Sequence, residues 1–244
     1  MTDTKALVTP ARDGIAAFVQ ARMASRRLPG KVLCEVAGKP LLQYLLERLS
    51  QCRQLGRVVV VTSRHPSDDP IAAFCDAHGT ECVRGDLDNV ASRFRDALER
   101  HDFAAFVRIS GDSPLLDPAL VDQAVDVFRT GGYQIVTNVM PRTYPRGQSV
   151  EVLDTGTFRG GFADMQNHAH FEHVTPYFYK SQRCFTIYNI AAPHDCSDVR
   201  LSVDTKADLD GFSRIVAAFT RPQWEYGLAE ILDIYRRVAA EPEQ

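Results

Sequence analysis

The stretch Ile15-Ala16-Ala17-Phe18-Val19-Gln20-Ala21-Arg22-Met23-Ala24-Ser25-Arg26-Arg27-Leu28-Pro29-Gly30-Lys31 decides the fold of this chain. Residues 15–21 predict a buried strand, and the loop that follows holds four cations within ten residues. Each phosphate of a ligand brings negative charge and strong acceptor oxygens, so such a loop suits a site that holds several phosphates at once. The stretch therefore favours a nucleoside triphosphate as ligand.

This loop does not match the common phosphate-binding motifs. It is not a P-loop, because Ser25 stands five residues before Gly30 and Val32 follows Lys31, and it is not a dinucleotide fingerprint. The charge run by itself is equally compatible with a solvated surface turn. The place of the loop after a buried strand favours a site, because ligands of open α/β sheets bind at the carboxyl ends of the strands.

The composition limits the class of protein. A chain of 244 residues with 45% hydrophobic content can bury one large core. The net charge of -3 excludes a global basic field, so neither nucleic acid nor a membrane surface is an expected partner. Six cysteines without a Cys-x-x-Cys pair predict reduced thiols, and the polar segment 1–14 is unlike a signal peptide. These features together predict a cytoplasmic protein.

The order of patterns predicts an α/β fold of three layers, with a mostly parallel sheet between helices. Expected strands cover 15–21, 57–62, 80–84 and 103–110 in the first half, then 133–138, 149–153, 184–190 and 199–203. Expected helices cover 41–52, 69–78, 89–100, 117–129, 155–165, 173–179, 205–219 and 225–239. We expect a flexible N-terminus over 1–13 and a single domain over 14–244. Within it, 139–190 is a candidate small lobe for acceptor binding or dimerisation.

Two aspartates are candidate ligands of a divalent cation. Asp112 follows the predicted strand 103–110 and Gly111, and Mg²⁺ takes one or two carboxylates together with substrate phosphates. Asp117, by contrast, precedes Pro118 and is interpreted as a helix N-cap. In the second segment Thr205 and Asp208 have the spacing of a capping box, which leaves Asp204 free for a metal or an acceptor.

Several motifs recur in one family in this order. They are the run 20–31, Ala37-Gly38-Lys39-Pro40-Leu41, Gly111-Asp112-Ser113-Pro114-Leu115 and Val203-Asp204-Thr205-Lys206-Ala207-Asp208-Leu209. The chain resembles the cytidylyltransferases that activate acidic sugars, such as 3-deoxy-manno-octulosonate and acylneuraminate cytidylyltransferases. It is most similar to the spore-coat polysaccharide biosynthesis branch, in which Val150-Glu151-Val152 and Glu172-His173-Val174-Thr175-Pro176-Tyr177 also recur. The resemblance spans nearly the whole chain.

The resemblance implies a fold like that of the nucleotide-diphospho-sugar transferases (GT-A-like). The implied reaction is transfer of CMP from CTP to a sugar acid with release of pyrophosphate, dependent on Mg²⁺, in surface polysaccharide or glycoconjugate biosynthesis. Homodimers are also implied.

The resemblance also implies residue roles. The triphosphate would contact Ala21, Arg22, Ser25, Arg27, Gly30 and Lys31. Asp112 and Asp204 would bind the metal, and Arg22, Lys31 and Asp112 would be catalytic. Asp88 and Arg93, assigned to nucleotide binding, would lie in a region that approaches the nucleotide or the sugar. The acceptor would contact Arg146, Glu151, Glu172 and His173.

The chain departs from this family pattern in the acceptor region. Relatives commonly have Pro-Asp-Gly-Leu-Asp before Val-Glu-Val, whereas this chain has Pro145-Arg146-Gly147-Gln148-Ser149, and Phe171 stands where an arginine is common. The identity of the sugar is therefore left open. An arginine at position 146 favours a carboxylate or phosphate on the acceptor.

Two rival functions and one rival site remain open at the level of sequence. Asp86-x-Asp88 resembles the metal-binding motif of glycosyltransferases, which consume nucleotide-sugars. A catalytically silent nucleotide-binding protein would bind CTP without turnover. His168, His170 and His173 match no defined zinc spacing, so we interpret the first two as solvated loop residues and the third as part of a helix start facing the acceptor.

Overall fold

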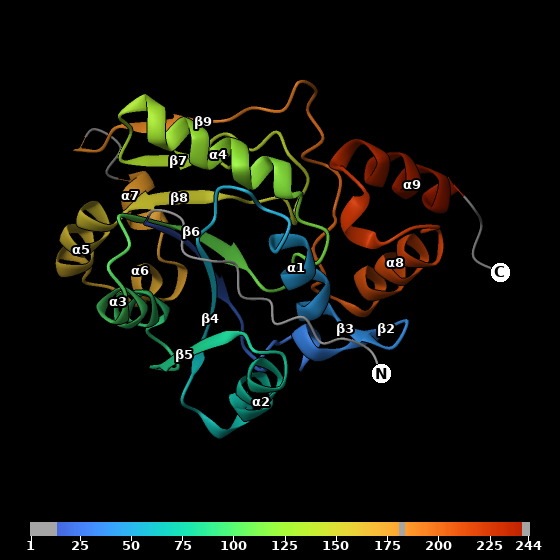
Figure 1. Cartoon of the computed structure of the whole chain (residues 1–244), viewed down its shortest axis with the longest axis horizontal. Coiled ribbons are helices and arrows are strands. Elements are labelled where there is room, and N and C mark those ends of the chain that lie inside the picture. Colours follow the sequence, from blue (N-terminus) through green and yellow to red (C-terminus); the bar gives the residue numbers. More distant parts are fainter. Residues whose placement is uncertain (1–13, 181–183, 241–244) are drawn as a thin grey trace.

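The computed structural model describes residues 14–180 and 184–240, so the predicted flexible segment 1–13 lies outside the described part. A seven-stranded sheet crosses the centre of the molecule (Figure 1). Its strands are β1 Ile15–Gln20, β4 Arg57–Ser63, β5 Glu81–Gly85, β6 Ala105–Ser110, β7 Ile135–Thr137, β8 Glu151–Asp154 and β9 Ile187–Asn189. Their order is β5-β4-β1-β6-β8-β7-β9, and within this sheet β8 alone runs against its neighbours. The predicted mostly parallel sheet is confirmed.

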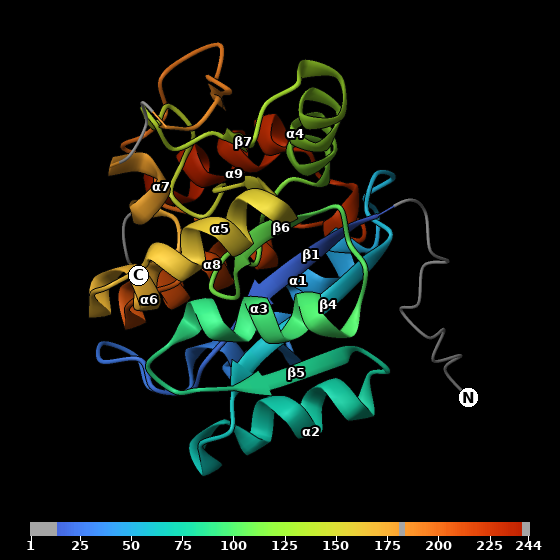
Figure 2. The same ribbon diagram turned by 90° about the vertical axis from the view of Figure 1, so that its left-hand side faces the viewer.

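Helices cover both faces of this sheet, as the three-layer prediction requires (Figures 1 and 2). They are α1 Leu41–Leu49, α2 Asp69–Ala77, α3 Val90–Arg100, α4 Pro118–Gly131, α5 Thr155–Asp164, α6 His168–His173, α7 Pro176–Lys180, α8 Lys206–Ala217 and α9 Leu228–Ala240. A short ladder of β2 Glu35–Val36 and β3 Lys39–Pro40 lies apart from the main sheet.

The central strand β1 explains why two faces are covered. Ala17 and Val19 point into one core with α1, α2 and α4, whereas Ala16 and Phe18 point into a second core with α3, α5 and α7. Strand residues alternate between faces, and β1 is apolar on both, so each face needs a helical layer. The end of β1, and the basic loop formed by residues 22–31 that follows it in the sequence, therefore lie at the carboxyl edge of a sheet that is packed on both faces.

A third core joins α8 and α9 to the rest of the chain. Phe212 and Ile234 from these helices pack with Tyr44 of α1. The fully buried Arg48 reinforces the junction by donating to the carbonyl oxygens of Leu116 (2.7 Å), Gln223 (2.5 Å) and Tyr226 (2.9 Å). Burial lowers the pKa of Arg48 to about 10. The C-terminal helices are therefore fixed against the sheet layer that carries the site.

The predicted strand 199–203 is wrong, because the segment forms only a single bridge between Arg200 and Arg146. Gly147 explains the packing: its φ is +95°, and a Cβ there would lie 2.5 Å from the Ser202 amide nitrogen. The segment 199–203 therefore lies directly against the backbone of Gly147. Apolar alternation alone did not reveal that no neighbouring strand is available for a ladder.

The predicted helix 173–179 is also wrong in its start. Helix α6 begins at His168 and ends at His173, so His168 and His170 are helical residues and His173 ends the helix. Val174 then takes φ 66° and ψ -68°, a rare conformation for a β-branched residue, before α7 begins at Pro176. Propensity reasoning gave no signal for this break.

All six cysteines are free, and Cys184 is exposed. No helix in the described ranges is both long enough and apolar enough to cross a membrane. Residues 139–190 contribute β8 and β9 to the main sheet, so this segment is partly integral to the domain.

Candidate active site

The carboxyl edge of the sheet gathers four loops. The segments after β1, β4, β5 and β6 begin there because these four strands are parallel. Backbone hydrogen bonds continue the strand pairing into the loops, from the Ala21 amide to the Val61 carbonyl (3.1 Å) and from the Gly111 amide to the Gln20 carbonyl (2.9 Å). The basic loop therefore lies beside Asp112.

The basic loop is closed by hydrogen bonds to the backbone carbonyl of Met23. The Met23 carbonyl accepts from the amides of Ser25 (2.9 Å) and Gly30 (2.8 Å). Gly30 has φ +73°, which a glycine adopts without strain, and it turns the chain into the short helix at Lys31–Leu33. Arg22, Arg26 and Arg27 are exposed, whereas Lys31 is buried. The closure thus presents three cations to solvent and directs the fourth inward.

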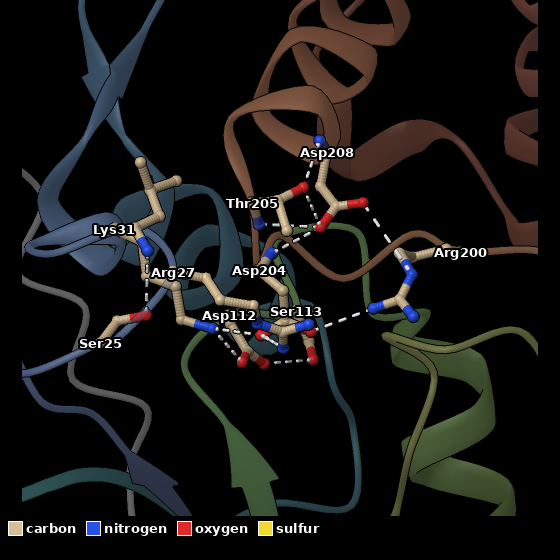
Figure 3. Close-up of polar contacts among 10 residues, drawn as sticks. Ser25, Arg27, Lys31, Asp112, Ser113, Arg200, Asp204, Thr205 and Asp208 are labelled. Atoms are coloured by element: carbon tan, nitrogen blue, oxygen red, sulfur yellow. Dashed lines mark hydrogen bonds and ion pairs between the residues drawn. The ribbon is translucent and has the colours of Figure 1, made fainter.

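Lys31 lies between the two predicted metal ligands (Figure 3). Its Nζ is 2.6 Å from Asp112 Oδ2 and 2.8 Å from Asp204 Oδ1. The Val203 amide donates to the Asp112 carbonyl (2.9 Å), which brings the two segments together. Sequence reasoning left open whether these carboxylates meet, and the structure shows that they bind the same ammonium group.

Asp204 is surrounded by cations. Besides Lys31, Arg27 lies 3.2 Å from Oδ1 and Arg200 lies 3.1 Å from Oδ2. Burial is the largest influence on the pKa of Asp204 and raises it, but Lys31, Arg27 and Arg200 together outweigh burial and hold the pKa below its usual value. Asp204 is therefore a carboxylate at neutral pH, charged and ready to bind a cation.

The neighbours of Asp204 confirm the predicted capping box. The Thr205 hydroxyl accepts from the Asp208 amide (3.2 Å), and Asp208 Oδ2 accepts from the Thr205 amide (2.8 Å). Asp208 also accepts from the Asp204 amide (3.0 Å). Asp117 likewise caps α4, accepting from the Ala119 amide (2.9 Å). These acids are used by the backbone, which leaves Asp112 and Asp204 as the candidate ligands.

The donor set fits a divalent cation that shares its coordination with phosphates. Mg²⁺ prefers carboxylate oxygens and keeps open positions for substrate oxygens. Asp112 and Asp204 already hold one cationic group between them. No cluster of three or more His, Cys, Asp or Glu side chains with metal-binding geometry occurs in the described ranges, so the remaining ligands would come from the nucleotide and water.

A second polar cluster lies at the same edge, around Glu151. This buried carboxylate pairs with Arg108 of β6 and accepts from the hydroxyl of Tyr179, while Arg108 also donates to Gln20 Oε1 (3.1 Å). Burial, followed by the charge of Glu151, raises the pKa of Tyr179 well above its usual value. The phenol therefore stays protonated and fixes the carboxylate.

Arg142 lies near this cluster and forms no salt bridge within the described ranges. It donates to Ser149 Oγ (3.0 Å) and approaches the Pro145 carbonyl (3.5 Å). Burial, and then the charge of Arg146, lower the pKa of Arg142, while the charge of Glu151 acts in the opposite direction. Of the predicted acceptor residues, Glu151 lies in the cluster, whereas Arg146 is exposed and its backbone bridges to Arg200.

The other two predicted acceptor residues lie on α6. Glu172 Oε1 is 3.3 Å from Arg22 Nη2 of the basic loop, and its other oxygen is 3.6 Å from His168. His173 is exposed at the end of the helix. Glu172 therefore contacts the predicted nucleotide loop directly.

The residues around Asp86 have structural tasks. Asp86 Oδ1 accepts from the amides of Asp88 (2.8 Å) and Asn89 (2.7 Å), which lowers the pKa of Asp86 and shapes the turn before α3. The buried Arg93 donates to the carbonyls of Asp86 (2.6 Å) and Leu87. Asp88 is exposed. Arg93 thus binds the backbone of this turn, and one oxygen of the exposed Asp86 carboxylate is used to shape it.

Sequence reasoning missed Asp68, Arg142, Tyr179 and Arg200. The only local signal at Asp68 is a run of acids before Pro70, which is typical of a helix start. Arg142, Tyr179 and Arg200 have no motif of their own. Their proximity to the site arises from tertiary packing.

Comparisons with known proteins show which family and which proteins this chain resembles. The sequence profile described as Cytidylyltransferase matches residues 16–206. The spore coat polysaccharide biosynthesis protein SpsF of Bacillus subtilis is 29% identical over 207 residues, which cover 81% of this chain and 84% of that protein. A 3-deoxy-manno-octulosonate cytidylyltransferase of Geobacter sulfurreducens is 36% identical over 113 residues, covering 46% of this chain and 44% of the relative.

A solved structure agrees over the entire fold. The structure of a cytidylyltransferase from Leptospira borgpetersenii superposes with a TM-score of 0.88 at 25% identity, covering 96% of this chain and all of the other. The resemblance predicted from the motifs is thereby confirmed. With a basic loop, paired aspartates and a profile match over most of its length, this chain belongs to the cytidylyltransferase family.

Proposed function

We propose that this protein transfers the cytidylyl group of CTP to a hydroxyl of an acidic sugar, releasing pyrophosphate and using Mg²⁺ as its metal. The observation that carries the proposal is the position of Lys31 between Asp112 and Asp204, directly behind the cation-rich loop. Membership of the cytidylyltransferase family supports the choice of nucleotide.

The reaction is an in-line displacement at the α-phosphorus. The acceptor oxygen forms a bond to that phosphorus while the bond to the bridging oxygen of the β-phosphate breaks, and the hydroxyl proton passes to water. Such transfers depend mainly on positioning and on electrostatic stabilisation of phosphate oxygens. No covalent enzyme intermediate is needed.

The residues of the basic loop bind and orient the triphosphate. Arg22 and Arg27 are exposed and Lys31 is buried, so the loop offers cations both at the surface and inside the site. Positive groups near nonbridging oxygens lower the energy of the charge that moves to the leaving pyrophosphate. Asp112 and Asp204 would hold Mg²⁺, which when bound supplies further positive charge beside the phosphates.

The cluster around Glu151 is the acceptor side. Arg108 pairs with the carboxylate of Glu151, and the charges of Glu151 and Arg146 both act on the neighbouring Arg142. A half-buried excess of positive charge favours an acceptor that brings a carboxylate or phosphate. These residues, apart from Arg108, lie within 139–190, so we assign acceptor binding to that segment.

Pyrophosphate release tests the proposal. The protein is assayed with each of the four nucleoside triphosphates and a panel of sugar acids and neutral sugars. We expect release with CTP and an acidic sugar, loss of at least about 100-fold in kcat for Asp112→Ala, and a nucleotide KM at least about tenfold higher for Lys31→Ala. Asp210→Ala, which changes an exposed carboxylate on α8, is the matched control and stays near wild type.

Other outcomes would contradict the proposal. Consumption of a nucleotide-sugar without pyrophosphate would identify a glycosyltransferase. Binding of CTP without turnover on any acceptor would identify a silent nucleotide-binding protein. Unchanged pyrophosphate release in both Asp112→Ala and Lys31→Ala would reject the site.

We extend the proposal to a cytoplasmic homodimer, in keeping with the family resemblance and the reduced thiols. Sedimentation equilibrium of the purified chain measures the oligomeric state directly.

A further inference from the structure

Asp68 is a fully buried carboxylate that binds the backbone of the basic loop. It lies at the end of the short helix Pro66–Asp68, between β4 and α2. Its Oδ1 accepts from the Met23 amide (2.7 Å), and its Oδ2 accepts from the amide (3.2 Å) and the hydroxyl of Ser63. A carboxylate removed from water needs several donors, and Asp68 has three of them.

A buried cation balances this carboxylate. Arg93 is also fully buried, and it lies close enough for the charges of Asp68 and Arg93 to interact. The hydrogen bonds of Arg93 go to the carbonyls of Asp86 and Leu87 instead of to the carboxylate. Asp68 thus keeps its oxygens for Met23 and Ser63.

The backbone of Met23 is the point at which the basic loop closes. The Met23 carbonyl accepts from the amides of both Ser25 and Gly30, while Asp68 accepts from the Met23 amide. The two backbone groups of this one residue therefore fix both ends of the segment 23–30. The backbone amides of Arg22, Ala24, Arg26 and Arg27 have no hydrogen-bond partner within the described ranges, so they are free to bind an anion.

We propose that Asp68 is a positioning residue for the triphosphate: it holds the backbone amide of Met23 so that the free amides and cations of the loop face the phosphates before the nucleotide arrives. The inference rests on the proposed function, because it concerns the same loop. A preorganised loop loses less conformational freedom on binding, so fixing Met23 in advance strengthens nucleotide binding. Asp68 does not contact the acceptor cluster, and its effect is therefore confined to the nucleotide.

The variant Asp68→Asn tests this role. Asparagine has one acceptor oxygen, which we expect to face the two donors of Ser63, so that its NH₂ group faces the Met23 amide and that hydrogen bond is lost together with the charge. We expect the Kd and KM for CTP to rise at least about tenfold, as for loss of a charged hydrogen bond, while the KM for the acceptor stays within about twofold. A merely structural loss would lower the active fraction, and hence the apparent kcat, without changing the nucleotide KM.

Ser63→Ala is the matched control. It removes the hydroxyl donor from Oδ2 and leaves the bond between Oδ1 and Met23 in place. We expect this variant to unfold more easily but to bind CTP within about threefold of wild type. Equal weakening of CTP binding in Ser63→Ala and Asp68→Asn would show a general packing effect and overturn the proposal.

An ester in place of the peptide bond between Arg22 and Met23 provides a second route if Asp68→Asn does not fold. The ester removes the Met23 N–H and keeps Asp68, Ser63 and the Met23 carbonyl unchanged. A rise in the Kd for CTP of about tenfold supports the proposal, and an unchanged Kd rejects it. Binding is measured without acceptor, so a wild-type protein that binds no nucleoside triphosphate contradicts the proposed function instead.

Discussion

Lys31 connects the two halves of the site, because its ammonium group binds a carboxylate from each of two segments that are remote in sequence. Asp204 in turn binds Arg27 and Arg200, so three cations surround it. Charges in such a network are already oriented, which reduces the reorganisation needed when phosphates and a metal enter. The motifs predicted Asp112 and Asp204 individually, whereas their common partner follows from the fold.

Arg142 offers a test of acceptor recognition at the scale of one residue. Arg142→Gln removes a half-buried guanidinium that forms no salt bridge in the described ranges, so an anionic acceptor loses a binding group. We expect the acceptor KM to rise about tenfold or more, with the KM for CTP within about twofold. Initial-rate kinetics with both substrates varied measure the two values.

The ester or alcohol analogue of the acidic acceptor is the control for Arg142. A neutral analogue should be equally poor with wild type and with Arg142→Gln, because the charge recognised by Arg142 is already absent. If the ratio of the KM for the neutral analogue to the KM for the acid is the same in Arg142→Gln as in wild type, this assignment is contradicted.

The elements of the first half follow closely from local patterns. β1, β4, β5 and β6 were predicted from apolar runs, and α1, α2 and α3 from helical periodicity, with ends that differ by a few residues. These strands are buried on both faces, so their apolar runs are continuous and easily recognised. In the second half α6, α7 and the segment 199–203 differ from prediction, because their conformation depends on partners that are distant in sequence.

At the amino edge of the sheet, one carboxylate joins three elements, and its contribution to stability should depend on pH. Glu81 begins β5 and binds His101 at the end of α3 (2.6 Å) and Arg57 at the start of β4 (2.8 Å). Burial raises the pKa of Glu81 and is the largest single influence, but the bonds from His101 and Arg57 outweigh it and leave the pKa below 4.5.

A carboxyl group whose pKa is lower in the folded than in the unfolded protein stabilises the fold at pH values above its unfolded-state pKa. This stabilisation is lost as the pH falls through its folded-state pKa. We therefore expect Glu81→Gln to cost on the order of 1 kcal/mol of unfolding free energy between pH 5 and 7, with the difference shrinking below about pH 4. Urea unfolding across this range measures it. Glu99→Gln, at an exposed ion pair, should cost less than about 0.5 kcal/mol at every pH, and equal costs would contradict the role of Glu81.

At the scale of the whole molecule, the site depends on how the C-terminal part packs against the sheet. The segment 199–203 lies against Gly147 and contains Arg200. Asp204 follows it directly and binds Lys31. The amide of Leu201 donates to the Arg146 carbonyl (2.7 Å), and the Ser202 amide donates to the same oxygen (3.0 Å). One close backbone contact therefore connects the acceptor segment with a predicted metal ligand.

Gly147→Ala tests this contact. The added Cβ would meet the Ser202 amide nitrogen at 2.5 Å, and the φ of +95° is unfavourable for alanine, so we expect a loss of about 3 kcal/mol or more in unfolding free energy. Gly160→Ala is the matched control, because its Cβ would meet nothing within 4 Å inside α5, and it should gain about 0.5 to 1 kcal/mol. Urea unfolding of both variants decides, and equal stability would contradict the packing argument.

The sequence by itself determined the α/β class, the basic loop after β1, the capping residues and the identity of the paired aspartates, because each depends on residues close together in the chain. The tertiary structure alone decided that Asp112 and Asp204 share Lys31, that Asp68 holds Met23, and that Arg108 and Tyr179 meet at Glu151. Those contacts join residues many positions apart. Their geometry is fixed by the packing of strands and helices, which no local pattern records.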